Sequence, residues 1–482
     1  MKLPLAFRLL ALIGVALLQG ACATGAPPRS AQIELPPTYD STVGGAQTEA
    51  LDHWWRLYDD AQLTGLVARA LAQGFSVREA LARLDESRAL RSVALSKFGP
   101  QGNLQANAEY RDTRDLDDNL TAMGSATAGG AASSVSKSAD VSLPVSWELD
   151  FFGRRSATER GAQADIESAR FDVESARAAI AAEVARTLFQ TRGLKVQRDE
   201  ALETVRIQRE LLGVVSERAR RGLAASSEAD RVAADLAQAE AQADDLGAAL
   251  TASRRALLVV VGSGTYALGD DDVLAALGGV PQVPAAMPGD LLARRPDVRM
   301  AAARVRKSAS DVRLAELDFF PRLTLNPGIG LSAQRGAFDT TTSFWSLAAG
   351  LTLPILDRPR LTAQLSAEGA RAEQSVLAYE RTVQTAFSEA DQALTRLQAD
   401  RRRVATLTAG EGRARTAYEA ALKRYELGFA NLQELLDGER AWRATRSALT
   451  GAKTDALQRS VQVFQALGGG WNATAQQTNM EG

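Results

Sequence analysis

Hydrophobic and polar residues follow two different periods along this chain, and the two periods predict two kinds of element. Short segments alternate residue by residue, which predicts β-strands with one apolar and one polar face. Long segments repeat apolar residues every three to four positions, which predicts helices. The order of strand, strand, long helix and shorter helix occurs twice. The pattern therefore predicts two copies of one unit, at 53–261 and 290–467, each with a helix before its strands.

Several landmarks keep the same order in both copies, which supports a duplication. Pro100 precedes the strands of the first copy, as Pro321 does in the second. The landmarks that follow are Leu143-Pro144-Val145 and Leu353-Pro354-Ile355 near the end of the second strand, then Gly222 and Gly428 after the long helix.

Four strands are predicted, at about 103–111, 134–149, 322–332 and 344–355. Each has about ten residues or more, the length that a tilted strand needs to cross the hydrocarbon layer of a membrane. Lys137 is the one charged residue on the apolar face of the second strand. Aromatic residues near the predicted strand ends, such as Tyr110, Trp147, Phe344 and Trp345, fit a membrane interface.

The strands alone allow two interpretations. One is a soluble sandwich with one wet face. The other is a membrane sheet, which four strands cannot close, because open sheet edges are not tolerated in lipid. Three copies would supply roughly twelve strands, enough for a barrel with an aqueous lumen.

Two helices are predicted to be much longer than a globular domain needs, at Ala157–Arg220 and Leu361–Glu426. At about 1.5 Å per residue, each is on the order of 100 Å long. Each ends at a glycine turn and returns through a shorter helix, Ser227–Val261 or Leu432–Gln465. Alanine-rich seams indicate close helix packing, so each copy predicts a helical hairpin.

The predicted fold class is therefore mainly α with a β membrane part. The segments outside the two copies are a signal peptide at 1–21, an extended tether at 22–52, a linker at 262–289 and a C-terminal tail at 468–482. Loops are predicted between the paired strands, at 112–132 and 334–343.

Composition and charge argue against several classes of function. The 56 Lys and Arg residues nearly balance 58 Asp and Glu residues, so no net field gathers nucleic acid. His53 is the only histidine, which disfavours His-paired catalysis and multi-His metal sites. Gly262-Ser263-Gly264 is too short for a phosphate loop. We therefore predict a protein that is not an enzyme and needs no cofactor.

The N-terminus has the layout of an export signal. Lys2 and Arg8 precede a short apolar stretch, and small residues precede Cys22, the only cysteine. This position resembles the lipobox of bacterial lipoproteins and predicts acylation of Cys22, although Gln19 stands where that motif has an aliphatic residue. The alternative is an ordinary signal peptide with an incidental cysteine.

Three motifs carry a family resemblance. Residues 291–298 (LLARRPDV), 147–154 (WELDFFGR) and 54–63 (WWRLYDDAQL) resemble hallmark segments of the TolC-like outer membrane efflux proteins, specifically of their lipidated, NodT-type branch in multidrug and heavy-metal efflux. For Arg294, Arg295 and Asp297, we expect a structural rather than a chemical role.

The resemblance implies a homotrimer in which a twelve-strand barrel in the outer membrane continues into a twelve-helix tube across the periplasm. It implies partners as well: outer-membrane lipid, a periplasmic adaptor protein and an inner-membrane RND-type pump. By match, the hairpin tips that meet the adaptor are Arg221, Gly222 and Leu223 in the first copy and Leu427, Gly428 and Phe429 in the second.

The resemblance also implies a periplasmic gate at Glu434 and Asp437, just after the second tip. Three-fold symmetry would turn each acid into a ring that favours cations and repels itself when the tube is shut. The alternative is that both acids merely favour the N-terminal end of their helix.

The predicted function is a passive exit duct for drugs, toxic compounds or metal ions, driven by the inner-membrane pump and opened by rearrangement of the hairpins. Two alternatives stay open. One is a duct for type I protein secretion, and the other is a lipid-anchored coiled coil without a pore.

Overall fold

The computed structural model describes residues 29–40, 51–114, 133–265, 276–283, 287–335 and 339–471. The chain is mainly helical and carries one antiparallel sheet. It forms two compact units. Unit 1 comprises Met1–Ser30, Glu86–Ile166 and Ala303–Val376, and unit 2 comprises Ala31–Asp85, Glu167–Ala302 and Leu377–Gly482. Each unit takes residues from both predicted copies, so the compact units do not coincide with the predicted repeat.

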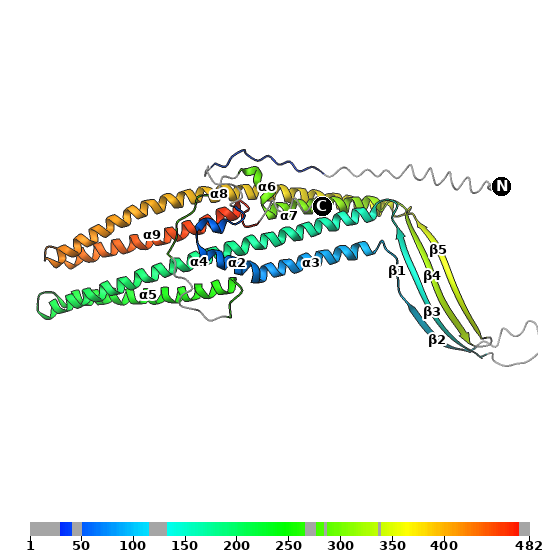
Figure 1. The fold of residues 1–482 in the computed structure, drawn as a ribbon, viewed down its shortest axis with the longest axis horizontal. Helices are drawn as coiled ribbons and strands as arrows, with labels where there is room; N and C mark the ends of the chain where they lie inside the picture. Colours follow the sequence, from blue (N-terminus) through cyan, green and yellow to red (C-terminus); the bar gives the residue numbers. More distant parts are fainter. Residues whose placement is uncertain are drawn as a thin grey trace, which may run out of the picture. The chain divides into compact units, whose positions relative to one another are not determined.

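Unit 1 contains the sheet, in which each strand runs antiparallel to its neighbours (Figure 1). The strands are β1 (Gln101–Gly102), β2 (Gln105–Arg114), β3 (Ser133–Leu149), β4 (Arg322–Arg335) and β5 (Thr340–Thr352). Both β1 and β2 pair with β3, which pairs with β4, which pairs with β5. Within the described residues β2 and β5 each pair on one side only, so this sheet is open.

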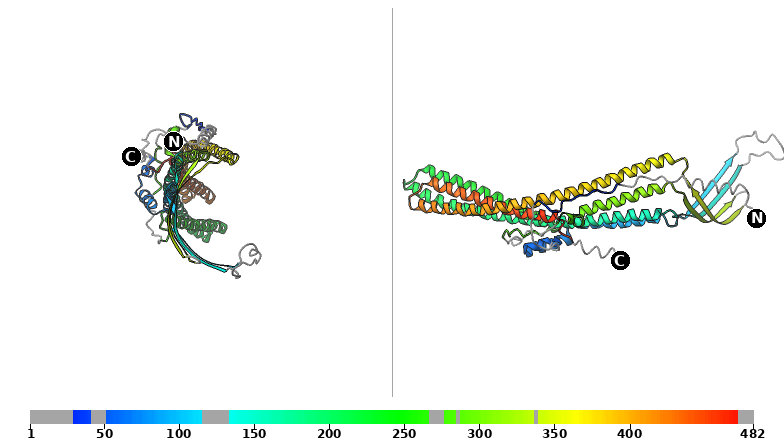
Figure 2. Two further views of the ribbon diagram at one scale, coloured as in Figure 1. Left: turned by 90° about the vertical axis from the view of Figure 1, so that its right-hand side faces the viewer. Right: turned by 90° about the horizontal axis from the view of Figure 1, so that it is seen from above.

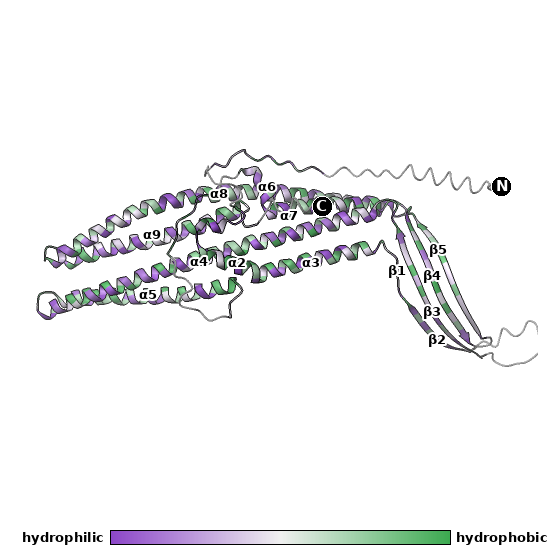
Figure 3. Ribbon diagram, in the orientation of Figure 1, coloured by the Kyte–Doolittle hydropathy of each residue, from purple (hydrophilic) through white to green (hydrophobic). Residues whose placement is uncertain are grey.

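The register places apolar residues in rows on one face of the sheet. Leu143 of β3 pairs with Ile329 of β4, which pairs with Trp345 of β5. Val141 likewise lies between Ala106 and Leu331. Hydropathy alternates along the strands accordingly (Figure 3). Several of these side chains are exposed, among them Ile329, Leu331, Trp345 and Leu351. One face of the sheet is therefore apolar and uncovered.

The strands extend further than the sequence pattern indicates. β4 continues to Arg335 and β5 begins at Thr340, so most of the loop predicted at 334–343 is strand. Phe344 and Trp345 consequently lie inside β5 and not near a strand end, which corrects that expectation. The physical reason is the run Thr340-Thr341-Thr342: β-branched residues favour a strand although they show no apolar alternation.

Helices α3 (Phe75–Ser96), α4 (Arg154–Arg220), α7 (Pro296–Leu317) and α8 (Arg358–Glu426) each contribute a part to unit 1. Val312 and Ala315 of α7 pack with Leu361 and Leu365 of α8. Arg91 of α3 forms an ion pair with Glu159 of α4 at 2.5 Å. These contacts hold the helices at the end of the sheet where β3 finishes and β4 begins.

Two helical hairpins make up much of unit 2. α4 lies beside α5 (Ser226–Val260), and α8 lies beside α9 (Leu432–Ala466) (Figure 2). Alanines close the first hairpin, where Ala201 of α4 packs with Ala239 and Ala243 of α5. Small side chains let two helix backbones approach closely, which explains why alanine dominates the predicted seams.

The main core of unit 2 is built around Trp54 of the short helix η2 (Trp54–Tyr58). Trp54 is fully buried and its ring stacks on Phe464 of α9, with 5.4 Å between the ring centroids. Val67 of α2 (Ala61–Gln73) and Leu188 of α4 belong to the same core. Helices from the start, middle and end of the chain thus share one apolar cluster.

Part of the predicted tether packs against a helix and is not a free extended segment. Residues 29–40 lie against α8, where the backbone N–H of Gln32 donates to Glu380 at 2.8 Å and that of Asp40 donates to Asp391 at 2.9 Å. Tyr39 is buried and stacks on Phe387. None of the helices in the described residues is both long enough and apolar enough to span a membrane.

Replacing Trp54 by Ala should destabilise the core of unit 2 by about 3–5 kcal/mol, since a buried aromatic is lost without refilling of the cavity. Chemical unfolding followed by circular dichroism measures the change. The matched control is Phe75→Ala, because Phe75 is 69% exposed and its loss should cost no more than about 0.5 kcal/mol. Equal costs for the two variants would contradict the assignment of Trp54 to the core.

Candidate functional site

The turn between α4 and α5 has the geometry that ends a helix at glycine. Gly222 has a φ of +74°, and the N–H of Leu223 donates to the carbonyl of Arg218 at 2.8 Å. This hydrogen bond satisfies a carbonyl that the helix end leaves open. Leu223 is 68% exposed, and Arg221 donates to Glu217 at 2.6 Å. The predicted tip residues therefore do lie together at a tight turn.

The turn between α8 and α9 repeats this geometry. Gly428 has a φ of +79°, and the N–H of Phe429 donates to the carbonyl of Arg424 at 2.8 Å. Leu427 and Phe429 are exposed, as Leu223 is at the first turn. Both turns thus present apolar side chains to the surroundings. Large exposed apolar groups at a rigid turn are typical of a contact surface for another protein.

Glu434 lies in the first turn of α9. Asn431 caps this helix by accepting from the backbone N–H of Glu434 at 2.8 Å. The Glu434 carboxylate accepts from Arg424 of α8 at 2.5 Å. A negative charge is favourable at the N-terminal end of a helix. Within one chain, Glu434 therefore acts as a helix-end acid and ties α9 to α8.

Asp437 lies one turn further into α9 and is more exposed. Its side chain is 58% exposed, against 42% for Glu434. It accepts from the Gln433 amide at 2.9 and 2.8 Å, and its closest cation is Arg440 at 3.8 Å. The charge of Asp437 is thus less compensated than that of Glu434. Of the two predicted gate acids, Asp437 is the better placed to face other charges.

One buried acid on the same helix as Glu434 and Asp437 was not predicted from the sequence. Glu439 of α9 is 2% exposed, accepts from Gln208 of α4 at 3.0 Å and pairs with Arg443 at 3.2 Å. Burial raises the pKa of Glu439, and Arg443 counteracts the rise. An available signal was its position in the sequence, between the apolar residues Leu436 and Trp442 of the α9 seam.

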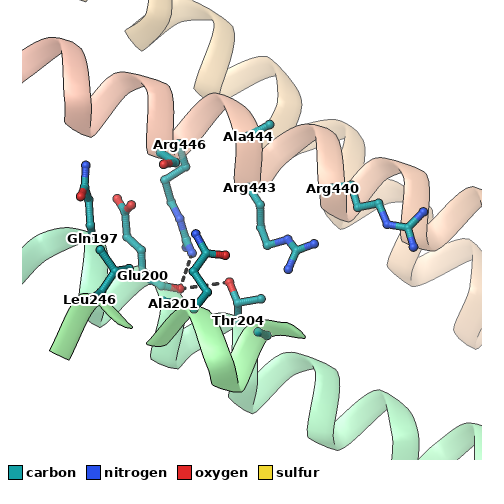
Figure 4. A pocket seen from close by; sticks show the side chains of 12 residues that line it. Gln197, Glu200, Ala201, Thr204, Leu246, Arg440, Arg443, Ala444 and Arg446 are labelled. Atoms are coloured by element: carbon teal, nitrogen blue, oxygen red, sulfur yellow. Dashed lines mark hydrogen bonds between the residues drawn. The ribbon is translucent and has the colours of Figure 1, made fainter. Parts of the chain in front are cut away.

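A cavity of about 380 Å³ lies between α4, α5 and α9 (Figure 4). Its charged lining residues already have partners. Arg440 pairs with Asp235 of α5 at 2.8 Å, and Arg446 donates to the backbone carbonyl of Glu200 at 2.9 Å. Burial raises the pKa of the Glu200 carboxyl, to which Thr450 donates at 2.8 Å. The cavity is therefore a polar seam that joins the two hairpins.

The motif at 147–154 fixes the transition from β3 to α4. The Asp150 carboxylate accepts from three backbone N–H groups, those of Gly153, Arg154 and Arg155, at 2.8–2.9 Å. Arg154 in turn pairs with Asp318 at 2.7 Å. Three donors on one carboxylate cap the start of the helix firmly.

The two arginines of the motif at 291–298 are buried and form ion pairs with acidic residues. Arg294 pairs with Asp52, and both are buried. Arg295 pairs with Asp297 at 2.7 Å and with Glu389 of α8 at 2.8 Å. Because these ion pairs link separate segments within unit 2, the contacts agree with the structural role expected for this motif.

The motif at 54–63 combines the core residue Trp54 with a helix cap. Asp60 caps α2 by accepting from the backbone N–H of Leu63 at 3.0 Å, and it also pairs with the buried Arg192 of α4. Hydrogen bonds to Arg192 and Leu63 outweigh burial and lower the pKa of Asp60. His53 packs edge-on against Trp55, with 5.4 Å between the ring centroids.

Two chemical expectations concern the acylation of Cys22 and the binding of metal ions. Cys22 lies outside the residues that the structure describes, so its acylation stays a prediction. Among the described residues, no group of three or more His, Cys, Asp and Glu side chains is arranged to hold a metal ion.

Comparison with known proteins identifies relatives along nearly the whole chain. The model of the family described as outer membrane efflux protein matches residues 66–263 and 287–469. The outer membrane protein OprJ of Pseudomonas aeruginosa is 31% identical over an alignment of 483 positions, which covers 95% of this chain and 96% of that protein. The pyoverdine export outer membrane protein OpmQ of Pseudomonas aeruginosa is 26% identical over 469 residues, covering 97% and 98%.

The fold is also similar to a solved channel structure. The outer-membrane channel OprN superimposes with a TM-score of 0.78 and is 27% identical, covering 93% of this chain and 98% of that chain.

Replacing Gly428 by Ala should destabilise the α8–α9 turn by about 1–2 kcal/mol, because a Cβ is unfavourable at positive φ. No atom crowds this position, so backbone strain is the only cost. Faster hydrogen exchange of the turn amides would report the change. The matched control is Gly412→Ala within α8, also uncrowded, where helix propensity should instead add about 1 kcal/mol of stability. The same sign in both variants would contradict this account.

Proposed function

The chain belongs to the outer membrane efflux protein family and is an outer-membrane component of an efflux system; from this premise, we propose that three copies assemble into a passive duct for small molecules. The duct consists of a barrel of roughly twelve strands, four long ones from each chain, followed by a tube of helices that crosses the periplasm. The protein supplies the path, and the energy comes from an inner-membrane pump.

The observation that carries this proposal is the open sheet with an exposed apolar face. β2 and β5 leave backbone donors and acceptors unpaired on their outer edges within the described part of the chain. Such edges cannot be placed in lipid, where water is absent and each unpaired group is costly. Pairing β5 of one copy with β2 of the next satisfies both edges, and three-fold repetition closes the cylinder.

Partners follow from the hairpin turns. Exposed apolar side chains at Leu223, Leu427 and Phe429 stand on turns held rigid by glycine geometry. We infer that a periplasmic adaptor binds these turns and connects the duct to an RND-type pump. The relatives are named for pyoverdine export and for toluene or solvent efflux, which supports a substrate class of small organic molecules.

The gate is assigned to α9. Three-fold symmetry would bring three copies of Asp437 around the axis, and their like charges would raise the free energy of a narrow entrance. Glu434 is engaged with Arg424 in each chain, so it contributes less free charge. Anchoring is assigned to Cys22, whose acyl chains would hold the N-terminus in the membrane together with the barrel.

Planar bilayer recordings with the purified full chain test the duct. We expect a trimer in detergent, measured by light scattering, and discrete steps of ion conductance. A monomeric particle that gives no current would favour the alternative of a coiled coil without a pore.

In the same recordings, Asp437→Ala should decrease the open probability several-fold, since the like-charge repulsion that opposes a narrow entrance is removed. Asp230→Ala is the matched control, because Asp230 is an exposed acid one turn into α5, near the other hairpin turn. Equal gating in the two variants would return Asp437 to a helix-end role.

Cys22→Ala should abolish incorporation of radioactive palmitate while leaving the sheet intact, because the chain then has no acceptor thiol. Labelling of cells followed by gel analysis of the purified protein measures it. Palmitate retained by the variant would exclude Cys22 as the anchor.

A further inference from the structure

Two cations lie side by side at one end of the apolar rows of the sheet. Lys137 of β3 pairs in the ladder with Arg335 of β4, and on its other side with Tyr110 of β2. The apolar rows Ala108–Ala139–Ala333 and Ala106–Val141–Leu331 follow on the same face. The row Tyr110–Lys137–Arg335, called the cationic row below, is thus part of the face that the proposed function places against lipid.

Neither cation is neutralised by a described neighbour. The Lys137 ammonium lies 5.6 Å from the centre of the Tyr110 ring, which attracts it weakly. Within the described residues, no ion pair involves Lys137 or Arg335. Asp112 stands on the same face, one pair further out and opposite Val135, and has an interaction of its own. Like charges directly opposite in a sheet repel each other, so the row needs an anion from elsewhere.

The depth of the cationic row can be estimated from the strand. Lys137 and Trp147 lie on the same face, ten residues apart along β3. At about 3.3 Å per residue, they are separated by about 33 Å along the strand. A strand tilted by about 40° would cover about 25 Å of membrane depth, the height of the apolar band of a barrel. If Trp147 marks one interface, the cationic row lies at the other.

The helices of unit 1 indicate on which side of the membrane the cationic row lies. β3 ends next to the start of α4, and β4 begins after the end of α7, so the Trp147 end of the sheet is its helical end. The proposed function places the helices in the periplasm. The cationic row then lies at the cell-surface interface, where charged residues on the lipid face are tolerated best and where anionic lipid headgroups are within reach.

We propose that the cationic row is a binding site for the phosphate group of an outer-leaflet lipid. The Lys137 ammonium and the Arg335 guanidinium donate charge-assisted hydrogen bonds to the phosphate oxygens, and the fork of Arg335 suits two of them at once. Tyr110 holds Lys137 in place through its ring and offers its hydroxyl to the headgroup. The lipid neutralises the repulsion between the two cations. This site rests on the proposed function, because it requires the apolar face to meet a membrane.

Native mass spectrometry of the detergent-purified assembly tests the site with lipid A, a phosphorylated lipid, as the probe. Wild type should retain lipid A in preference to phosphatidylcholine. The variant Lys137→Gln/Arg335→Gln should lose about tenfold in affinity, as expected when charge-assisted hydrogen bonds to a phosphate are lost. The matched control is Lys97→Gln/Arg155→Gln, which removes the same charge from exposed residues at the helical end of the sheet.

Each outcome of these measurements either supports or overturns the proposed lipid site. Equal lipid A affinity in wild type and the Lys137→Gln/Arg335→Gln variant would overturn the proposal, as would an equal loss in the control. Complete displacement of lipid A by millimolar inorganic phosphate would identify a free-anion site and overturn the assignment to lipid. Bilayer recordings keep the two hypotheses apart. A conducting trimer that shows no preference for lipid A rejects this site alone, whereas absence of trimer and current rejects the duct.

Discussion

Unpaired backbone groups at the edges of the sheet constrain everything else in this protein. The described strands form an open sheet, with β2 and β5 each paired on one side. In water such edges could be hydrated, but in hydrocarbon they must be paired. The proposed trimer, in which further copies of the chain complete the sheet, would meet this requirement. The exposed apolar face of the same sheet is a second observation that agrees with a lipid environment.

The same requirement explains how the motifs are used. In the proposed assembly, the strands must pass into helices at fixed positions, so that the hairpins of several chains can meet in register. Asp150 caps α4 within five residues of the end of β3, and Arg154 ties this junction to Asp318 at the end of α7. In unit 2, Trp54 and the pair Arg294–Asp52 join segments from distant parts of the sequence. The residues of the family resemblance thus make structural contacts within the chain.

Periodicity predicted the elements well because each element has a strong local signal. The glycine turns at Gly222 and Gly428 and the bounds of the long helices could be read to within a few residues. The start of β5 could not, since a run of threonines has strand propensity without alternation. Glu439 was missed although it stands between the apolar residues Leu436 and Trp442, and its partner Gln208 on α4 becomes visible only in the structure. The ion pair of Glu434 with Arg424 of α8, which distinguishes Glu434 from Asp437, is likewise visible only in the tertiary structure.

The contrast between Glu434 and Asp437 bears on how a passive duct can be both closed and ready to open. An acid paired within its own chain keeps its partner in every state and adds little to the balance between states. An acid without a firm partner is costly only where symmetry gathers its copies, and that cost disappears when the copies separate. Asp437, held by an amide at 2.8 Å and by a cation only at 3.8 Å, is of the second kind. In the proposed gate, repulsion would be stored in the closed state, so a partner that spreads the hairpins would release free energy already present in the assembly.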